Sequence, residues 1–131
     1  MSNLSHVHDD LCSVKCILIV EDDAAIGNFL QEAIQDEIAT PVLLASSGEQ
    51  ALHLLQTSEP ALCLLDYHLP GLNGLELAHR VCSREGCEHL PILLMSSELP
   101  PINETKCHLK TLRKPFDLEK LLQLIATLLT S

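Results

Sequence analysis

The stretch Pro60–Gly74 reads P-A-L-C-L-L-D-Y-H-L-P-G-L-N-G, and it decides the fold. Within it, the apolar run 61–65 ends at Asp66, and a turn rich in proline and glycine follows. A short apolar run bounded by turn residues is typical of a strand that is buried on both faces. The stretch therefore predicts a buried strand with a carboxylate at its carboxyl end.

Apolar blocks and amphipathic stretches alternate on both sides of this strand. The other predicted strands are 16–20, 41–45, 92–95 and, more weakly, 111–113. Apolar residues at helical spacing predict helices over about 26–34, 47–57, 75–82 and 118–129. This alternation predicts an α/β fold in which right-handed crossovers build a parallel sheet covered by helices on both faces.

Two local signals mark the limits of the helix at 47–57. Ser47 and Gln50 have the spacing of a capping box, with Ser47 as the N-cap and Gln50 reaching back to it. Pro60 is expected to end this helical region and to precede the next strand.

Polar residues with one shared chemistry follow the predicted strands. The first strand ends in Glu21-Asp22-Asp23, and the others end at Asp66, Ser96 and Lys114. Ligands of open α/β sheets bind beyond the carboxyl ends of the strands, so these side chains are expected to converge. Clustered carboxylates repel one another unless a cation offsets their charge, and Mg²⁺ prefers such oxygen ligands. The pattern therefore predicts a Mg²⁺ site beside a hydroxyl and an ammonium group.

Four strings carry a resemblance to a known family. They are I-L-I-V-E-D-D, L-L-D-Y-H-L-P-G-L-N-G, M-S-S and K-P-F, and they occur in the family's order over about residues 15–129. The sequence resembles the response-regulator receiver domains of two-component signalling, the CheY-like family. The resemblance implies a flavodoxin-like, doubly wound (βα)5 fold with a five-stranded parallel sheet.

The resemblance also implies a role for each strand-end residue. Asp66 matches the phospho-acceptor, Lys114 the phosphoryl-binding lysine and Ser96 the switch hydroxyl. The residues that match the Mg²⁺ ligands are Asp22, Asp23, Asp66 and His68, the last through its backbone carbonyl. The Lys114-Pro115 bond is often cis in the family.

The function implied is that of a phospho-acceptor in a phosphorelay. A histidine kinase or histidine phosphotransfer protein would pass a phosphoryl group to Asp66, and water would later hydrolyse the acyl phosphate. Both steps occur on the domain itself, so we do not expect an enzyme that acts on a separate substrate. A downstream protein target or a fused output domain would receive the signal.

Several alternatives compete with this interpretation. A pseudo-receiver would use the same fold as an interaction module without phosphorylation, although the intact acceptor set argues against it. A haloacid-dehalogenase-type phosphatase needs a second Asp two positions after the first, where this sequence has His68. No glycine-rich phosphate-binding motif supports a flavin or nucleotide carrier. Taken singly, Asp22 and Asp23 could simply cap a helix, and the glycines could simply form turns.

Composition limits the remaining possibilities. The 131 residues, 47 % of them hydrophobic, fit one domain, expected over residues 15–131. Residues 1–14 are interpreted as a flexible tail, in which His6 and His8 resemble metal ligands but more simply belong to a polar segment. A net charge of -10 disfavours nucleic-acid binding, and no apolar run approaches the roughly 20 residues that span a bilayer. We expect a cytoplasmic protein without membrane contact.

The cysteines are predicted to be free thiols, because they form no C-x-x-C pair and no signal peptide precedes them. All six are included in this prediction: Cys12, Cys16, Cys63, Cys82, Cys87 and Cys107.

The segment between Ser96 and Lys114 is predicted to be unusual. It has only 17 residues and contains Pro100 and Pro101, so that any helix there would be short, about Asn103–His108. Receivers typically carry an aromatic residue three positions before the lysine, where this sequence has Thr111. Phosphorylation would then be reported through ordering of residues 97–109 or through a partner bound to the first helix.

Overall fold

One parallel sheet forms the centre of the computed structural model, which describes residues 15–98 and 107–130. Its five strands lie in the order β2-β1-β3-β4-β5. The strands are β1 (Lys15–Val20), β2 (Val42–Ala45), β3 (Glu59–Asp66), β4 (Pro91–Ser96) and β5 (His108–Arg113). This order reverses direction between β1 and β3, which confirms the doubly wound α/β fold predicted from the sequence.

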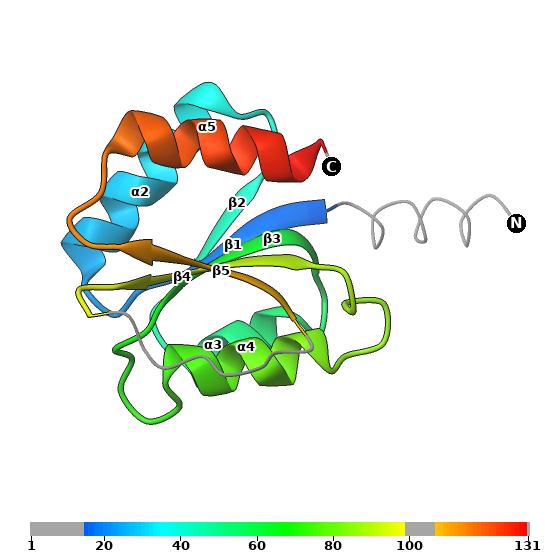
Figure 1. Ribbon diagram of the computed structural model, residues 1–131. Helices are drawn as coiled ribbons and strands as arrows, with labels where there is room; N and C mark the ends of the chain where they lie inside the picture. The colour runs from blue at the N-terminus through cyan, green and yellow to red at the C-terminus, as the bar shows by residue number, and fades with distance from the viewer. Residues whose placement is uncertain (1–14, 99–106, 131) are drawn as a thin grey trace, which may run out of the picture.

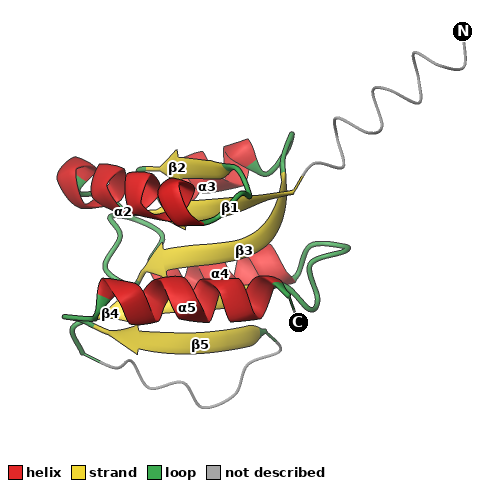
Figure 2. Ribbon diagram, turned by 90° about the horizontal axis from the view of Figure 1, so that it is seen from above, coloured by secondary structure: helices red, strands yellow, loops and turns green. Residues whose placement is uncertain are grey.

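Helices cover both faces of the sheet. Helices α2 (Ala24–Glu37) and α5 (Leu118–Leu129) lie on one face, and α3 (Gly48–Leu54) and α4 (Gly74–Cys82) lie on the other (Figure 1). Seen from above, α2 and α5 lie in front of the sheet, with α3 and α4 behind it (Figure 2). None of the helices in the described residues is long and apolar enough to cross a membrane.

Strand pleating divides the core into two aliphatic layers. Leu18 of β1 faces the layer under α3 and α4, whereas its neighbour Ile17 faces the layer under α2 and α5. Both side chains are fully buried, as are those of most residues in β1, β3 and β4. Strands that are buried on both faces read as continuous apolar runs, which explains why the sequence located them.

Two local predictions need correction. Pro60 does not precede β3 but lies inside it, where the pairing with β1 shifts register and β3 contains one extra residue. Proline is tolerated at such a bulge because no ladder hydrogen bond needs its missing N–H. Ser47 does cap α3 by accepting from the Gln50 N–H at 3.0 Å, but the Gln50 side chain accepts from the Ser46 amide and hydroxyl, not from Ser47.

The segment between β4 and β5 is described only at its two ends. The prediction of a short helix at Asn103–His108 falls mainly outside the described residues, and His108 itself is the first residue of β5. β5 therefore begins three residues earlier than expected. Thr111 lies in this strand with its side chain exposed. The tail predicted over residues 1–14 also lies outside the described residues.

The prediction of free cysteines is wrong for one pair. Cys82 and Cys107 form a disulfide between the end of α4 and the start of β5, with their Cα atoms 5.7 Å apart. Cys16, Cys63 and Cys87 are free and buried, whereas Cys12 lies outside the described residues. The two bonded residues are 25 positions apart, and only the packing of α4 against the β4-β5 edge brings them together.

Candidate functional site

Three consecutive acids leave the carboxyl end of β1 in different directions. Glu21 is 3 % exposed, and its Oε2 atom accepts a hydrogen bond from the Asp23 N–H at 3.1 Å. The side chain of Asp22 is exposed. Asp23 is the N-cap of α2 and accepts from the Ile26 N–H at 3.1 Å through Oδ1. Asp23 thus caps the helix, whereas the Glu21 side chain points into the protein.

Asp66 ends β3 beside the switch in strand order and is only 5 % exposed. A turn after it returns the chain closely, because the Gly74 N–H donates to the Tyr67 carbonyl at 2.9 Å. A Cβ atom on Gly74 would lie 2.4 Å from the carbonyl oxygen of Asp66. Only glycine permits this approach. The L-P-G-L-N-G turn therefore fixes the backbone directly after the acid.

Lys114 reaches the buried acids from the end of β5. Its Nζ atom lies 3.3 Å from Asp66 Oδ1 and 3.8 Å from Glu21 Oε1. The Lys114 backbone N–H donates to the Ser96 carbonyl at 2.8 Å, and the Lys114-Pro115 peptide bond is cis. Three strands, β1, β3 and β5, thus deliver a cation and two carboxylates to one place.

The Ser96 hydroxyl is engaged by the chain that follows it. Ser96 is 1 % exposed, and its hydroxyl donates to the Glu98 carbonyl while accepting from the Glu98 N–H. This local turn lies at the carboxyl end of β4, the neighbour of β3. Ser96 is therefore held at the same edge of the sheet as Asp66.

Carboxylate oxygens of Glu21, Asp22 and Asp66 lie within 4.8 Å of one another, a spacing that suits a shared metal ion. Glu21 Oε1 is buried and has no hydrogen-bond partner within the described part of the chain. Burial raises the pKa of Glu21 from 4.5 to about 7; the Asp23 N–H and Lys114 oppose this effect and Asp66 adds to it. A hard divalent cation would stabilise this site, where a buried carboxylate with one unpaired oxygen lies beside two others within the described residues.

The matching family model covers residues 17–126 and describes a response regulator receiver domain. The chain belongs to this family. Receiver domains belong to two-component systems, and the family generally binds Mg²⁺ in an acidic pocket; this chain has an acidic cluster of Glu21, Asp22 and Asp66.

Curated relatives agree with this assignment. Sporulation initiation phosphotransferase F of Bacillus subtilis is 33 % identical over 109 residues, a match that covers 80 % of this chain and 86 % of that protein. Transcriptional regulatory protein AfsQ1 of Streptomyces coelicolor is 36 % identical over 81 residues, but the match covers 62 % of this chain and 34 % of that protein. The chain thus spans less than half the length of several longer relatives.

Solved structures show the same fold. Chemotaxis protein CheY4 of Vibrio cholerae superposes with a TM-score of 0.77 at 24 % identity, covering 88 % of this chain and 99 % of that one. A CheY-like receiver domain protein of Methanospirillum hungatei gives a TM-score of 0.76 at 25 % identity, covering 90 % and 95 % of the two chains.

The structure brings together most of the residues expected from the sequence. Asp22, Asp66 and Lys114 meet at one edge, and Ser96 lies at the adjacent strand end. Asp23 does not join the acidic cluster, and Glu21 takes its place. The position of Glu21 could have indicated that it joins the cluster. It directly follows the last buried residue of β1, and burial continues one residue beyond the strand.

Proposed function

We propose that this receiver domain accepts a phosphoryl group on Asp66 in a Mg²⁺-dependent reaction. The observation that carries the proposal is the contact of Lys114 with Asp66, 3.3 Å apart, inside a cluster of three carboxylates. Asp66 is buried enough to be shielded from bulk water, and it lies at the carboxyl end of a strand where phosphoryl donors can approach.

The acidic cluster would hold the cation. Glu21, Asp22 and Asp66 supply carboxylate oxygens, and the His68 backbone carbonyl is the further ligand that the family resemblance implies. When bound, Mg²⁺ would screen the negative charge of the carboxylates and of the incoming phosphoryl oxygens. Asp23 is not included, because its carboxylate caps α2.

The chain's own groups would perform the transfer. An Asp66 carboxylate oxygen attacks phosphorus, a new P–O bond forms, and the bond from phosphorus to the donor breaks. Lys114 is placed to turn from the carboxylate to a phosphoryl oxygen, because its ammonium group already lies beside Asp66. The Ser96 hydroxyl can offer a second donor once it leaves its local turn with Glu98.

Hydrolysis of the acyl phosphate would then restore Asp66. Both steps take place on the domain's own Asp66, so the protein would not be an enzyme for a separate substrate. The phosphoryl donor would be a histidine kinase or a histidine phosphotransfer protein, in keeping with the similarity to sporulation initiation phosphotransferase F. A downstream protein or an attached output domain would receive the signal in the cytoplasm.

The competing proposal is a pseudo-receiver that binds partners without phosphorylation. Such a domain has no need for a contact between Lys114 and the buried Asp66 beside a buried Glu21 oxygen, Oε1, that has no hydrogen-bond partner within the described residues. Burying these groups costs free energy, which a ligand at the site would offset. The retained cluster therefore favours the phospho-acceptor.

Acetyl phosphate with Mg²⁺ provides a direct test, read by intact mass and by phosphate-affinity electrophoresis. We expect one phosphoryl group on the wild-type chain and none on Asp66→Asn or without Mg²⁺. Asp117→Asn is the matched control, because Asp117 caps α5 outside the cluster and Asn retains a capping side chain. Equal labelling of Asp66→Asn, or no labelling of the folded wild type, would refute the proposal.

A further inference from the structure

The disulfide between Cys82 and Cys107 joins two elements that lie on different layers of the molecule. Cys82 is the last residue of α4, on one face of the sheet, and Cys107 directly precedes β5. Figure 1 shows α4 beneath the sheet edge that β4 and β5 form. The bond therefore ties an edge strand to the helix layer below it.

β5 depends on few other contacts to keep its place. It pairs with β4 alone, because it is the last strand in the sheet order. Four of its six residues are exposed and two are half-buried, so none is fully buried. Its carboxyl end is fixed by the Lys114 N–H, which donates to Ser96 O, and its amino end is fixed by the disulfide.

The same strand carries Lys114 to the acidic cluster. The ammonium group that lies 3.3 Å from Asp66 follows β5 by one residue. An edge strand that opens more often would hold this lysine beside Asp66 for less of the time. A bond at one end of β5 can thus affect the chemistry at the other end.

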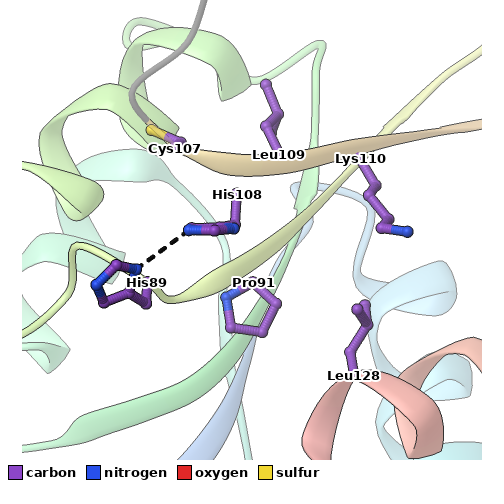
Figure 3. A pocket seen from close by; sticks show the side chains of 7 residues that line it. All are labelled: His89, Pro91, Cys107, His108, Leu109, Lys110 and Leu128. Carbon is purple, nitrogen blue, oxygen red and sulfur yellow. Dashed lines mark hydrogen bonds between the residues drawn. The ribbon is translucent and has the colours of Figure 1, made fainter. Parts of the chain in front are cut away.

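A cavity lies at the amino end of β5, on the opposite side of the strand from the bond. Cys107 is one of the residues that line this cavity of about 340 Å³, together with His89, His108 and Lys110 (Figure 3). The Cys107 sulfur points away from this cavity into the α4 layer, where it bonds to Cys82, so a small thiol must approach the bond from the α4 side. The bonded cysteines are themselves 9 % and 8 % exposed, so they lie at the surface of the core and not inside it.

The remaining described cysteines are poor competitors for exchange. Burial raises the pKa values of Cys16, Cys63 and Cys87, and Cys63 is completely buried. Thiol–disulfide exchange requires a thiolate, so the raised pKa values disfavour attack on the bond by these three residues. Burial and the raised pKa values therefore favour the pairing of Cys82 with Cys107 over reshuffling within the described residues.

We propose that Cys82 and Cys107 are a reversible thiol–disulfide site for a small thiol, and that opening the bond loosens β5 and slows phosphorylation of Asp66. The phosphorylation part rests on the function proposed above. In the reaction, the thiolate of one small thiol attacks the Cys107 sulfur, the S–S bond breaks, and Cys82 leaves as a thiolate that takes up a proton. A second small thiol attacks the mixed disulfide and releases Cys107, so that two small thiols are oxidised to one disulfide and the protein gains two thiols. The small oxidised disulfide reverses both steps.

Glutathione is the probe for the test. Oxidised full-length protein is treated with reduced or oxidised glutathione, and thiols are counted by alkylation and mass spectrometry under native conditions. Hydrogen exchange is then followed in peptides that cover β5, and the rate of labelling by acetyl phosphate is measured in parallel. Reduction should add two alkylated thiols at Cys82 and Cys107, raise exchange in β5 by about tenfold and slow labelling several-fold.

Two variants serve as controls. The double variant Cys82→Ser/Cys107→Ser should show the β5 hydrogen exchange and the labelling rate of the reduced wild type, and glutathione should change neither. Cys87→Ala retains the disulfide and should respond to glutathione like the wild type. Because the reduced wild type needs no substitution, the test does not depend on the folding of either variant.

The outcomes distinguish failure of the exchange site, of the tether, of the link to Asp66 and of the proposed function. A bond that resists glutathione in the folded protein would refute the exchange site, and unchanged β5 exchange after reduction would refute the tether. Faster β5 exchange with an unchanged labelling rate would refute the link to Asp66. A complete lack of labelling in the oxidised protein would instead refute the proposed function, because hydrogen exchange reports on the tether without it.

Discussion

Replacing Glu21 by Gln is expected to stabilise the protein above neutral pH when no divalent cation is present. The Glu21 side chain is almost completely buried, and its Oε1 atom lacks a hydrogen-bond partner in the described structure. Gln keeps a carbonyl oxygen to accept from the Asp23 N–H, and its amide group can donate toward Asp66. The substitution therefore removes a buried charge while it retains the shape of the side chain.

The sign and size of the effect follow from the raised pKa. Burial raises the pKa of Glu21 from 4.5 to about 7, so the folded protein holds this proton more tightly than the unfolded chain does. The resulting stabilisation is fully present below pH 4.5 and is lost as the pH rises through 7. The difference between the two pKa values corresponds to about 3 kcal/mol at most, at about 1.4 kcal/mol per pH unit.

Urea denaturation across a pH series, in the presence of a chelator, measures this difference. The free energies of unfolding of wild type and Glu21→Gln should agree within about 0.5 kcal/mol near pH 4.5 and diverge in favour of Gln up to pH 8. Addition of Mg²⁺ at pH 8 should stabilise the wild type more than the variant, because ligand binding to the folded state adds to its stability. Parallel pH curves for the two proteins would refute the argument.

Three further predictions concern the metal ligands, the turn and the disulfide. Mg²⁺ should raise the melting temperature of the wild type and of Asp23→Asn, because Asn at position 23 still caps the helix, but it should not raise that of Asp22→Asn. If Asp23→Asn also loses the stabilisation by Mg²⁺, Asp22 and Asp23 together bind the ion, as expected from the sequence. Gly74→Ala should lower the free energy of unfolding in urea by about 1–3 kcal/mol, because its Cβ would lie 2.4 Å from a backbone carbonyl oxygen; unchanged stability would contradict this contact. Reduction of Cys82–Cys107 should lower the same quantity by about 3 kcal/mol, since the bond joins residues 25 positions apart; a negligible loss would show that β5 does not depend on it.

Most strands and helices could be predicted from the sequence, because each has a local pattern of apolar residues. The apolar runs 16–20 and 61–65 are strands in the structure, and the apolar stripe of 118–129 is α5. The sequence predicted only the second half of β5, because this edge strand consists mostly of exposed residues and lacks the continuous apolar run of the central strands. The hydrogen-bond partner of Gln50 was predicted as Ser47 but is Ser46. The two donors are neighbours in the sequence, and only the folded turn determines which of them lies within reach.

The sequence by itself determined which chemistry gathers at the sheet edge. In a parallel sheet all carboxyl ends meet on one side, so the positions of Asp66 and Lys114 directly after strands were enough to predict that they converge. The sequence did not determine which of the three consecutive acids join them, because the turn after β1 places Glu21 and Asp22 beside Asp66 and leaves Asp23 to cap the N-terminus of α2. Nor did it determine the Cys82–Cys107 bond, because sulfur atoms 25 residues apart pair only where packing brings a helix end and a strand start within reach.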